Sequence, residues 1–296
     1  MTHAGARPGS SRVIVLPTDF QRPARRAFLH GMKLAIAIKA RLHILHVIKT
    51  PTDRSGEARD SRFLRSLRTS ALLELGRLVR TARDGGASGQ PQLLYGDPVS
   101  CILETVKRTH AGMIVMGTEG RIGWDRLRIG STAEALVREA PCPVLTVHGG
   151  LAGDVARHPA RVRLRRVLIA TDFSRPADAA LRTASGVALN LAATVRLVHV
   201  VDPSSDKARA ERKIAVQVHD LRHRGLEAEG ECLAGEPVQA ILTDAGVWHA
   251  DLLAVGTSGR QGLHRLALGS VAEELLRRSG CPVLTVGKHA GSGNAP

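Results

Sequence analysis

Short apolar segments rich in β-branched residues alternate along the chain with longer segments whose apolar residues recur every three or four positions. In the first half the short segments are 13–16, 42–48, 113–116 and 144–147, and they are continuous, without alternation between apolar and polar residues. Continuous runs of this length are typical of parallel strands that are covered on both faces. The pattern therefore predicts an α/β fold in which helices cover both faces of a parallel sheet.

Helical periodicity fills the gaps between these segments. The first helix is expected to open with Pro23, because proline fits the first turn of a helix. Spacings of three and four residues predict one buried face on this helix and on its counterpart in the second half. The expected positions are Ala24, Ala27, Phe28, Gly31, Leu34, Ala35 and Ile38, and then, after Pro176, Ala177, Ala180, Leu181, Ala184, Val187, Ala188 and Leu191. Further helices are expected over 63–79 and 214–221, and from Pro98 and Pro237 onward.

The chain contains an internal duplication. Thr-Asp-Phe at 18–20 recurs at 171–173, and the hexapeptide Cys-Pro-Val-Leu-Thr-Val that starts at Cys142 recurs from Cys281. Each copy holds five predicted strands, so we expect two tandem doubly wound modules of five-stranded parallel sheet with strand order 3-2-1-4-5. The predicted domains are 1–155, with an ordered core of about 11–148, and 156–296, with an ordered core of about 164–287.

Length and composition agree with two globular modules. The chain has 296 residues, of which 43% are hydrophobic and 23% are charged. Its longest apolar runs are five to seven residues, whereas a membrane-spanning helix requires about 20. Residues 1–12 lack the apolar stretch of a secretory signal, and no CxxC pair is present among the four cysteines. We therefore expect a cytoplasmic protein with reduced thiols and no membrane partner.

The net charge points to anionic ligands without naming one. Forty-two lysines and arginines against 27 acidic residues give +15, and such an excess attracts polyanions. Aromatic residues make up only 2% of the chain, so the stacking platform used for single-stranded nucleic acid is missing. Nucleic acid is therefore kept as an alternative ligand, not as the leading one.

A glycine-rich motif, G-x2-G-x9-G-S, follows the fourth strand of each half, at 117–131 and 256–270. Glycines permit close approach of the backbone, so that N–H groups can converge on an anion. The closing serines, Ser131 and Ser270, are predicted to be helix N-caps, where unpaired N–H groups attract phosphate. Matched arginines within the motif are suited to neutralise phosphate charge; they are Arg121, Arg126, Arg260 and Arg265. The alternative is that these glycines form simple turns.

An acidic residue ends the first strand of each half, Asp19 and Asp172. In a sheet of order 3-2-1-4-5 the ligand crevice lies beyond the carboxyl ends of strands one and four, where the strand order reverses. This carboxylate is placed to accept a hydrogen bond from a ribose hydroxyl or to hold a metal that bridges phosphates. Capping of the following helix is the other role considered for it.

These motifs together resemble the universal stress protein family in its tandem-domain form, over roughly 11–148 and 164–287. The resemblance implies an adenine-nucleotide alpha-hydrolase-like fold and ATP as ligand, with Mg²⁺ as an optional companion. It places the first-strand Asp near the nucleoside and the backbone of the valine that ends strand two against adenine. The residues expected to bind ATP are Pro17, Asp19, Val47, Gly117, Thr118, Gly120, Arg121, Gly130, Ser131 and Thr132, and in the second half Ala170, Asp172, Val200, Gly256, Thr257, Gly259, Arg260, Gly269, Ser270 and Val271.

The two halves depart from one another in places. Asp251 opens the fourth strand of the second half, where the first has Gly112. That position lies at the far end of the strand, so we expect a local capping effect. Pro17 in the first half is matched by Ala170, so the two pockets are expected to differ in affinity.

Other matched residues have structural explanations. His46 and His199 have no second His or Cys at metal spacing and are expected to be hydrogen-bonded strand residues. Cys142 and Cys281 are expected to be small core residues beside the last strands. The arginine-rich stretch 161–166 is expected to be a solvated linker, and the glycine-rich tail from 287 is assigned no function.

The leading hypothesis is an ATP-binding sensor or adaptor in the stress response, which contacts an unknown protein partner through loops that order on nucleotide binding. No catalytic motif stands out, so enzymatic activity is limited to an alternative, a slow ATPase or nucleotidyl transferase. A basic, non-specific nucleic-acid binder is the second alternative. The last strand of each module is expected to be a bare sheet edge. We expect the two edges to pair within one chain and leave a further homodimer open.

Overall fold

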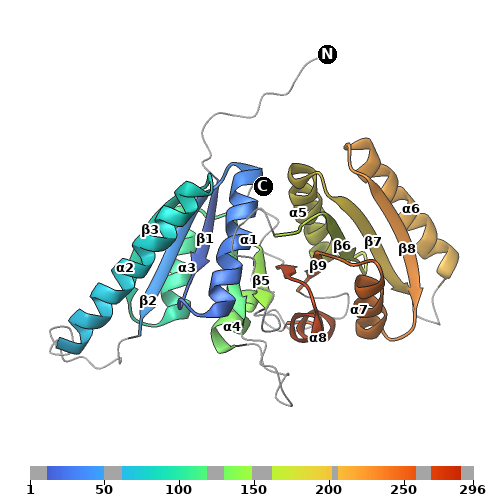
Figure 1. Cartoon of the computed structure of the whole chain (residues 1–296). Coiled ribbons are helices and arrows are strands. Elements are labelled where there is room, and N and C mark those ends of the chain that lie inside the picture. The colour runs from blue at the N-terminus through green and yellow to red at the C-terminus, as the bar shows by residue number, and fades with distance from the viewer. Residues whose placement is uncertain are drawn as a thin grey trace.

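The computed structural model describes residues 12–49, 62–118, 130–148, 162–201, 206–257 and 268–287 (Figure 1). The first half contains β1 (Val13–Pro17), α1 (Arg22–Ile38), β2 (Arg41–Ile48), α2 (Arg62–Asp84), β3 (Ser88–Tyr95), α3 (Pro98–Thr109), β4 (Met113–Thr118), α4 (Ser131–Glu139) and β5 (Val144–His148). The second half contains β6 (Arg166–Ala170), α5 (Arg175–Leu191), β7 (Thr194–Val201), α6 (Lys207–His223), β8 (Ala228–Ala234), α7 (Pro237–Val247), β9 (Leu252–Gly256), α8 (Ser270–Arg278) and β10 (Val283–Val286). The alternation predicted from the sequence is confirmed.

All ten strands form one sheet, in the order β3-β2-β1-β4-β5-β10-β9-β6-β7-β8. Each half therefore has the predicted order 3-2-1-4-5, and every pairing within a half is parallel. In both halves the chain leaves the first strand toward one side and returns to the other side of it for the fourth. The carboxyl ends of β1 and β4, and those of β6 and β9, are therefore the two positions where strand order reverses.

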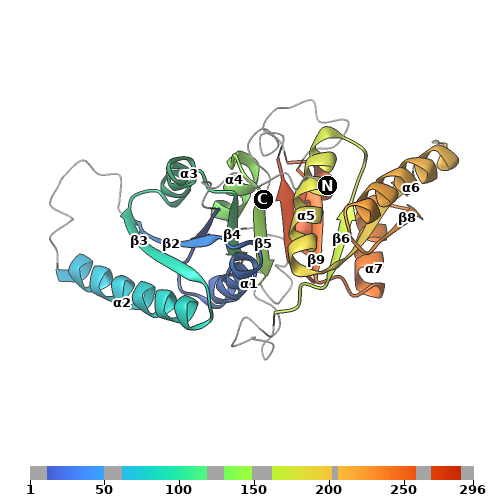
Figure 2. The same cartoon turned by 90° about the horizontal axis from the view of Figure 1, so that it is seen from above.

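Helices cover both faces of the sheet, as Figure 2 shows for the first half. The core on one face is built with residues of α1, α2, α5 and α6, and the core on the other face with residues of α3, α4, α7 and α8. Strand residues alternate between the two cores; Ile14 and Leu16 join the first, whereas Val13 and Val15 join the second. Burial on both faces explains why the strand sequences are continuously apolar.

The first helix of each module is buried more widely than its apolar stripe predicts. On α1 the predicted positions are buried, and Leu29, His30 and Met32 are buried with them. On α5 the buried set includes Ala179, Thr183 and Ser185, while Leu181 and Leu191 are only half-buried. The predicted face is confirmed on α1 and for most of its positions on α5. Burial is wider than predicted because α1 and α5 pack on the sheet and also against each other.

The two halves meet through their last strands, as predicted. β5 and β10 pair antiparallel, with Leu145 opposite Leu284 and with Thr146 opposite Val283. The Thr146 hydroxyl donates to the Val283 carbonyl at 3.2 Å, and the matched Thr285 hydroxyl donates to the Val144 carbonyl at 3.1 Å. This reciprocity is the signature of an isologous, two-fold contact, so one chain contains a pseudo-symmetric pair of modules.

The second helices differ in length, because α2 spans 23 residues and α6 spans 17. The predicted boundary at residue 155 and the glycine-rich tail after residue 287 lie outside the described residues and stay predictions. None of the helices in the described part of the chain combines the length and the hydrophobicity that crossing a bilayer requires.

Candidate functional site

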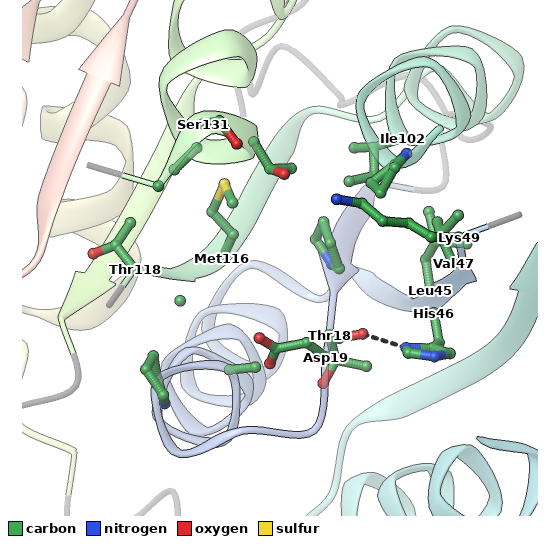
Figure 3. Close-up of a pocket in the computed structure, with 18 residues that line it drawn as sticks. Thr18, Asp19, Leu45, His46, Val47, Lys49, Ile102, Met116, Thr118 and Ser131 are labelled. Carbon is green, nitrogen blue, oxygen red and sulfur yellow. Dashed lines mark hydrogen bonds between the residues drawn. The ribbon is translucent and has the colours of Figure 1, made fainter. Parts of the chain in front are cut away.

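A pocket of about 410 Å³ opens at the carboxyl ends of β1, β2 and β4, beside the first turns of α1, α3 and α4. This is the predicted crevice of the first half, and Figure 3 shows its interior. It is lined by Pro17, Thr18, Asp19, Pro23, Ala24, Leu45, His46, Val47, Lys49, Pro98, Ile102, Met116, Gly117, Thr118, Gly130, Ser131, Thr132 and Ala133. Its volume falls within the range of small-molecule sites, which is about 300–1,000 Å³.

The pocket brings together the residues that the sequence singles out in the first half. The predicted residues that line it are Pro17, Asp19, Val47, Gly117, Thr118, Gly130, Ser131 and Thr132. They come from three strands and one helix that are far apart in the sequence. Gly120 and Arg121 lie outside the described residues, as do Arg126 and the rest of the loop from 119 to 129. Where the second glycine and the loop arginines stand relative to the pocket therefore stays a prediction.

Gly117 has a packing role that sequence reasoning did not identify. A Cβ atom at this position would lie 2.3 Å from the carbonyl carbon of Pro23 and 2.4 Å from the amide nitrogen of Ala24. Backbone atoms of α1 cannot move aside as a flexible side chain would. Glycine is therefore required for the first turn of α1 to approach the end of β4. Gly256 repeats the arrangement, with a virtual Cβ 2.7 Å from the carbonyl carbon of Pro176.

The aspartate after β1 holds the turn into α1. Asp19 Oδ1 accepts the N–H of Gln21 at 2.9 Å, and Thr18 Oγ1 accepts the N–H of Phe20 at 3.0 Å. Gln21, not Asp19, is the N-cap of α1, so the helix-capping role considered for the aspartate is wrong. Asp19 makes a tight turn through the residue two positions on. In Figure 3 its side chain extends into the pocket.

The prediction that the serines cap the helices after the loops is also wrong. Gly130 and Gly269 are the N-caps of α4 and α8, and Ser131 and Ser270 are the first helical residues. Glycine takes the extended cap conformation but has no side chain to bond the first-turn N–H groups. The first-turn N–H groups of a helix have no partner inside the helix. In α4 the residues that carry these groups, Ser131, Thr132 and Ala133, line the pocket.

The strand histidines are structural, as predicted. His46 Nδ1 lies 2.7 Å from the Thr18 carbonyl oxygen, and its ring packs on Phe20 with centroids 4.5 Å apart. His199 repeats both contacts with Thr171 at 2.8 Å and Phe173 at 4.5 Å. Among the described residues no group of three or more His, Cys, Asp and Glu is placed to hold a metal ion. These histidines hold the end of the second strand against the turn that follows the first.

Sequence reasoning missed the apolar floor of the pocket and one charged side chain. Leu45, Ile102 and Met116 supply apolar surface suited to a flat ring. Lys49, one residue beyond β2, extends its amine into the pocket in Figure 3. The signal that could have found Lys49 is its place two residues after Val47, where the chain leaves the same sheet edge.

The matched residues of the second half occupy equivalent places in the fold. Ala170 ends β6, Val200 lies near the end of β7, Gly256 ends β9 and is followed by Thr257, and Ser270 with Val271 opens α8. Asp172 Oδ1 accepts the N–H of Ser174 at 3.0 Å, as Asp19 does in the first half. The N–H of Gly269 donates to the Thr257 carbonyl at 2.7 Å. Gly259, Arg260 and Arg265 lie outside the described residues.

Asp251 and the matched cysteines Cys142 and Cys281 have structural roles, as expected. Asp251 lies at the opposite end of the sheet from the pocket, where its Oδ2 accepts the N–H groups of Arg165 and Arg166 at 2.8 and 3.1 Å. Cys142 is buried, and burial raises the pKa of its thiol to about 12. Burial also raises the pKa of Cys281. A high pKa keeps a thiol protonated and poorly reactive.

Comparison with known proteins identifies the family that has this architecture. The profile of the universal stress protein family matches residues 10–148 and 163–287. Universal stress protein MJ0531 of Methanocaldococcus jannaschii is 31% identical over 136 residues, which cover 45% of this chain and 80% of that protein. Universal stress protein Rv2005c of Mycobacterium tuberculosis is 26% identical over 212 residues, which cover 68% of this chain and 70% of that protein.

Solved structures have the same fold. The crystal structure of a universal stress protein from Archaeoglobus fulgidus superposes with a TM-score of 0.76 at 23% identity, over 95% of this chain and all of that one. The family profile matches both halves, and the tandem arrangement extends over the whole chain. The chain therefore belongs to the universal stress protein family, with two tandem copies of the family's domain.

Proposed function

We propose that the pocket at the ends of β1 and β4 binds ATP, and that the chain acts as a cytoplasmic sensor or adaptor in the stress response. The observation that supports this most directly is the convergence of eight sequence-selected residues on one cavity of about 410 Å³. Four of them, Asp19, Gly117, Gly130 and Ser131, have sequence features suited to phosphate or ribose binding, and the family resemblance implies the other four. Convergence from separate strands is expected of a ligand site and is not required for a turn.

The pocket has two chemically distinct ends that match the two ends of a nucleotide. Leu45 and Ile102 offer apolar surface for a base on the side of the pocket where Figure 3 shows Val47, whereas Met116 lies on the side of Ser131. The first turn of α4 offers N–H groups and a positive helix end to phosphates. Asp19 projects into the pocket with an oxygen suited to a ribose hydroxyl. ATP is the ligand class that uses all three parts at once.

Magnesium would enter the site together with the triphosphate. The Asp19 carboxylate is the acidic group among the described lining residues, and one carboxylate with phosphate oxygens is a usual environment for Mg²⁺. When bound, the ion would supply positive charge between phosphate groups. Asp19 would then orient the ion and the ribose, which is a binding role and not a catalytic one.

Isothermal titration with ATP tests the proposal, on protein that has been freed of bound ligand. Gly130→Asp and Gly269→Asp are the most informative variants, because a Cβ at Gly130 meets no atom within 4 Å and aspartate is a favourable N-cap. The new carboxylate would bind the first-turn N–H groups and repel phosphate. We expect each variant to abolish ATP binding in its own half and the double variant to give no heat.

Gly280→Asp is the matched control, because Gly280 is exposed, lies outside the pocket and has open space around its virtual Cβ. It adds the same charge and should leave ATP binding unchanged. A wild-type chain that gives no heat with ATP contradicts the proposal. So does a double variant that is folded by circular dichroism and binds ATP as tightly as the wild type.

A further inference from the structure

The duplication allows each lining position of the first pocket to be compared with its counterpart in the second half. Thirteen of the 18 lining positions have the same residue type at the matched position. The five that differ are Pro17 with Ala170, Leu45 with Val198, Lys49 with Asp202, Met116 with Val255 and Thr132 with Val271. Three of the five exchange one apolar residue for another. The remaining two change the polarity of the site.

Lys49 is the larger of these two changes. It is the one lysine or arginine among the described lining residues of the pocket. Figure 3 shows its amine directed across the cavity toward the wall formed by Met116 and Ser131. Ser131 opens α4, whose first turn is the phosphate end of the proposed site. The amine therefore lies on the path between the base end and the phosphate end.

The surroundings leave Lys49 available to an anionic ligand. The residue is exposed, and its charge acts on Asp97, the N-cap of α3. Asp97 is already occupied, because its Oδ2 accepts both the N–H and the hydroxyl of Ser100 at 2.8 Å. These bonds to Ser100 are the main cause of the lowered pKa of Asp97, and the charge of Lys49 adds to them. Because Lys49 is exposed and the neighbouring carboxylate already accepts hydrogen bonds from Ser100, the lysine amine can turn toward a phosphate at little cost in free energy.

Thr132 changes the site in the same direction. It lies in the first turn of α4 and lines the pocket, whereas the second half has Val271 at this position. A hydroxyl in the first turn offers one more donor to a phosphate oxygen, and valine offers none. Both polarity differences therefore favour a more highly charged ligand in the first half.

We propose that Lys49 makes the first pocket selective for nucleoside polyphosphates over the uncharged nucleoside, by pairing its amine with the phosphate chain. The inference rests on the proposed function, since it assumes an adenine compound in this pocket. Lys49 lies outside the glycine-rich motif, and it would add a group that discriminates between ligands by their charge. It also makes the duplicated sites unequal: the first is matched to polyphosphate, and Asp202 stands at the same sequence position in the second half.

The test measures the affinities for ATP and for adenosine in a chain whose second site is disabled by Gly269→Asp. In this background Lys49→Asp introduces the residue found at the matched position of the second half. A hydrogen bond to a charged group is typically strong enough for a change of about tenfold or more. We expect Lys49→Asp to weaken ATP binding about tenfold or more and to change adenosine binding less than about threefold.

Lys49→Met separates charge from packing, because methionine keeps an apolar stem of similar shape. We expect it to weaken ATP binding less than Lys49→Asp does, and to remove most of the salt dependence of ATP binding. Lys39→Asp is the matched control for net charge. Lys39 is exposed and ends α1 in a left-handed conformation that aspartate tolerates, at the opposite edge of the sheet from the pocket.

The outcomes separate the two proposals. If ATP binds and Lys49→Asp leaves its affinity unchanged, or weakens ATP and adenosine equally, the inference about Lys49 is wrong while the nucleotide site stands. If neither ATP nor adenosine binds the wild-type chain, both proposals fall together. A loss of ATP affinity in Lys39→Asp equal to that in Lys49→Asp would reduce the effect to net charge and would also overturn the role of Lys49.

Discussion

The glycines that begin the two loop motifs serve packing before they serve any ligand. Gly117 lies one residue before the end of β4 and Gly256 ends β9, and at both positions a side chain would overlap the backbone of the helix that packs on the sheet. The contact is with Pro23 and Pro176, the prolines that open the first helices. The same small residue thus sets how closely the first turn of α1 approaches the end of β4, beside the pocket that Gly117, Pro23 and Ala24 line. Structure and proposed ligand binding are coupled at this position.

Gly117→Ala is therefore expected to lower the free energy of unfolding by about 2–3 kcal/mol, the cost of forcing extra atoms into a packed site. Urea unfolding followed by circular dichroism measures it. Gly246→Ala is the control, because Gly246 lies in α7 and a Cβ there meets no atom within 4 Å. Alanine favours helix, so this change should be neutral or stabilising by up to about 1 kcal/mol. Equal stability of the two variants would refute the packing role of Gly117.

Sequence reasoning reached the pocket but missed one packing contact and misplaced one helix cap. It selected Gly117 for phosphate chemistry without its close approach to α1, and it made Ser131 the N-cap of α4, which is Gly130. Periodicity and motif spacing report which residues share a strand end. They do not report how closely two backbones approach, and only the assembled structure shows that. Lys49 was missed because a long side chain beyond a strand has no periodic pattern.

Ion pairing in the second half joins three elements that the apolar pattern does not connect. Arg196 of β7 donates to both oxygens of Asp244 on α7, at 2.8 and 2.9 Å, and to Glu229 of β8 at 2.8 Å. Its side chain is 17% exposed and that of Asp244 is 11% exposed. In the first half the matched position is His43, which bonds Gln92 of β3 in place of an acidic group. The two halves of the sheet thus hold their second and third strands together with different side-chain chemistry.

Arg196→Met should destabilise the chain by about 2–3 kcal/mol, because it leaves the Asp244 carboxylate largely buried without its partner. Thermal and urea unfolding at low salt would measure the loss. Arg77→Met is the comparison, since the pair of Arg77 with Glu74 lies on the exposed side of α2, with the arginine 67% exposed. That change should cost no more than about 0.5 kcal/mol. Similar losses for both variants would show that the Arg196 cluster adds nothing beyond a surface pair.

Buried histidines give the folding stability of the chain a defined pH dependence. Burial lowers the pKa of His30 on α1 and of His148 at the end of β5, and the charge of Arg26 lowers both further. A histidine whose pKa is lower in the folded state binds protons mainly when unfolded. Stability is therefore lost as the pH falls below the unfolded value of about 6.5 and continues to fall until the folded pKa is passed.

The free energy of unfolding should accordingly decrease between pH 7.5 and pH 5.5, and His30→Gln with His148→Gln should flatten that decrease. His43 contributes with the same sign, since burial lowers its pKa as well. His219 is exposed on α6, so His219→Gln serves as the control and should leave the pH profile unchanged. Urea titrations at several pH values provide the measurement. A profile that the double variant leaves unaltered would show that other groups cause the dependence.

The chain as a whole contains two modules that pair with each other as the subunits of a homodimer do. At the centre of the ten-stranded sheet Leu145 faces Leu284, its own counterpart in the duplication, and the threonine bonds on either side are reciprocal. The sequence predicted this pairing because a bare apolar edge strand is prone to pair with another edge. It could not predict the additional packing of α1 on α5, which depends on how the two halves of the sheet are oriented where they join.

Because the contact is isologous, one module should be able to replace the other. Residues 1–155 expressed alone would expose the β5 edge and the side of α1 that packs against α5, and both surfaces are self-complementary by the pseudo-symmetry. We expect this half to form a homodimer through antiparallel β5 pairing, measurable by sedimentation velocity. Thr146→Lys places a charge on that edge and should keep the half monomeric. A wild-type half that is folded and stays monomeric at about 100 μM, well above the micromolar range of specific association, would mean that the covalent link, not the surface, holds the modules together.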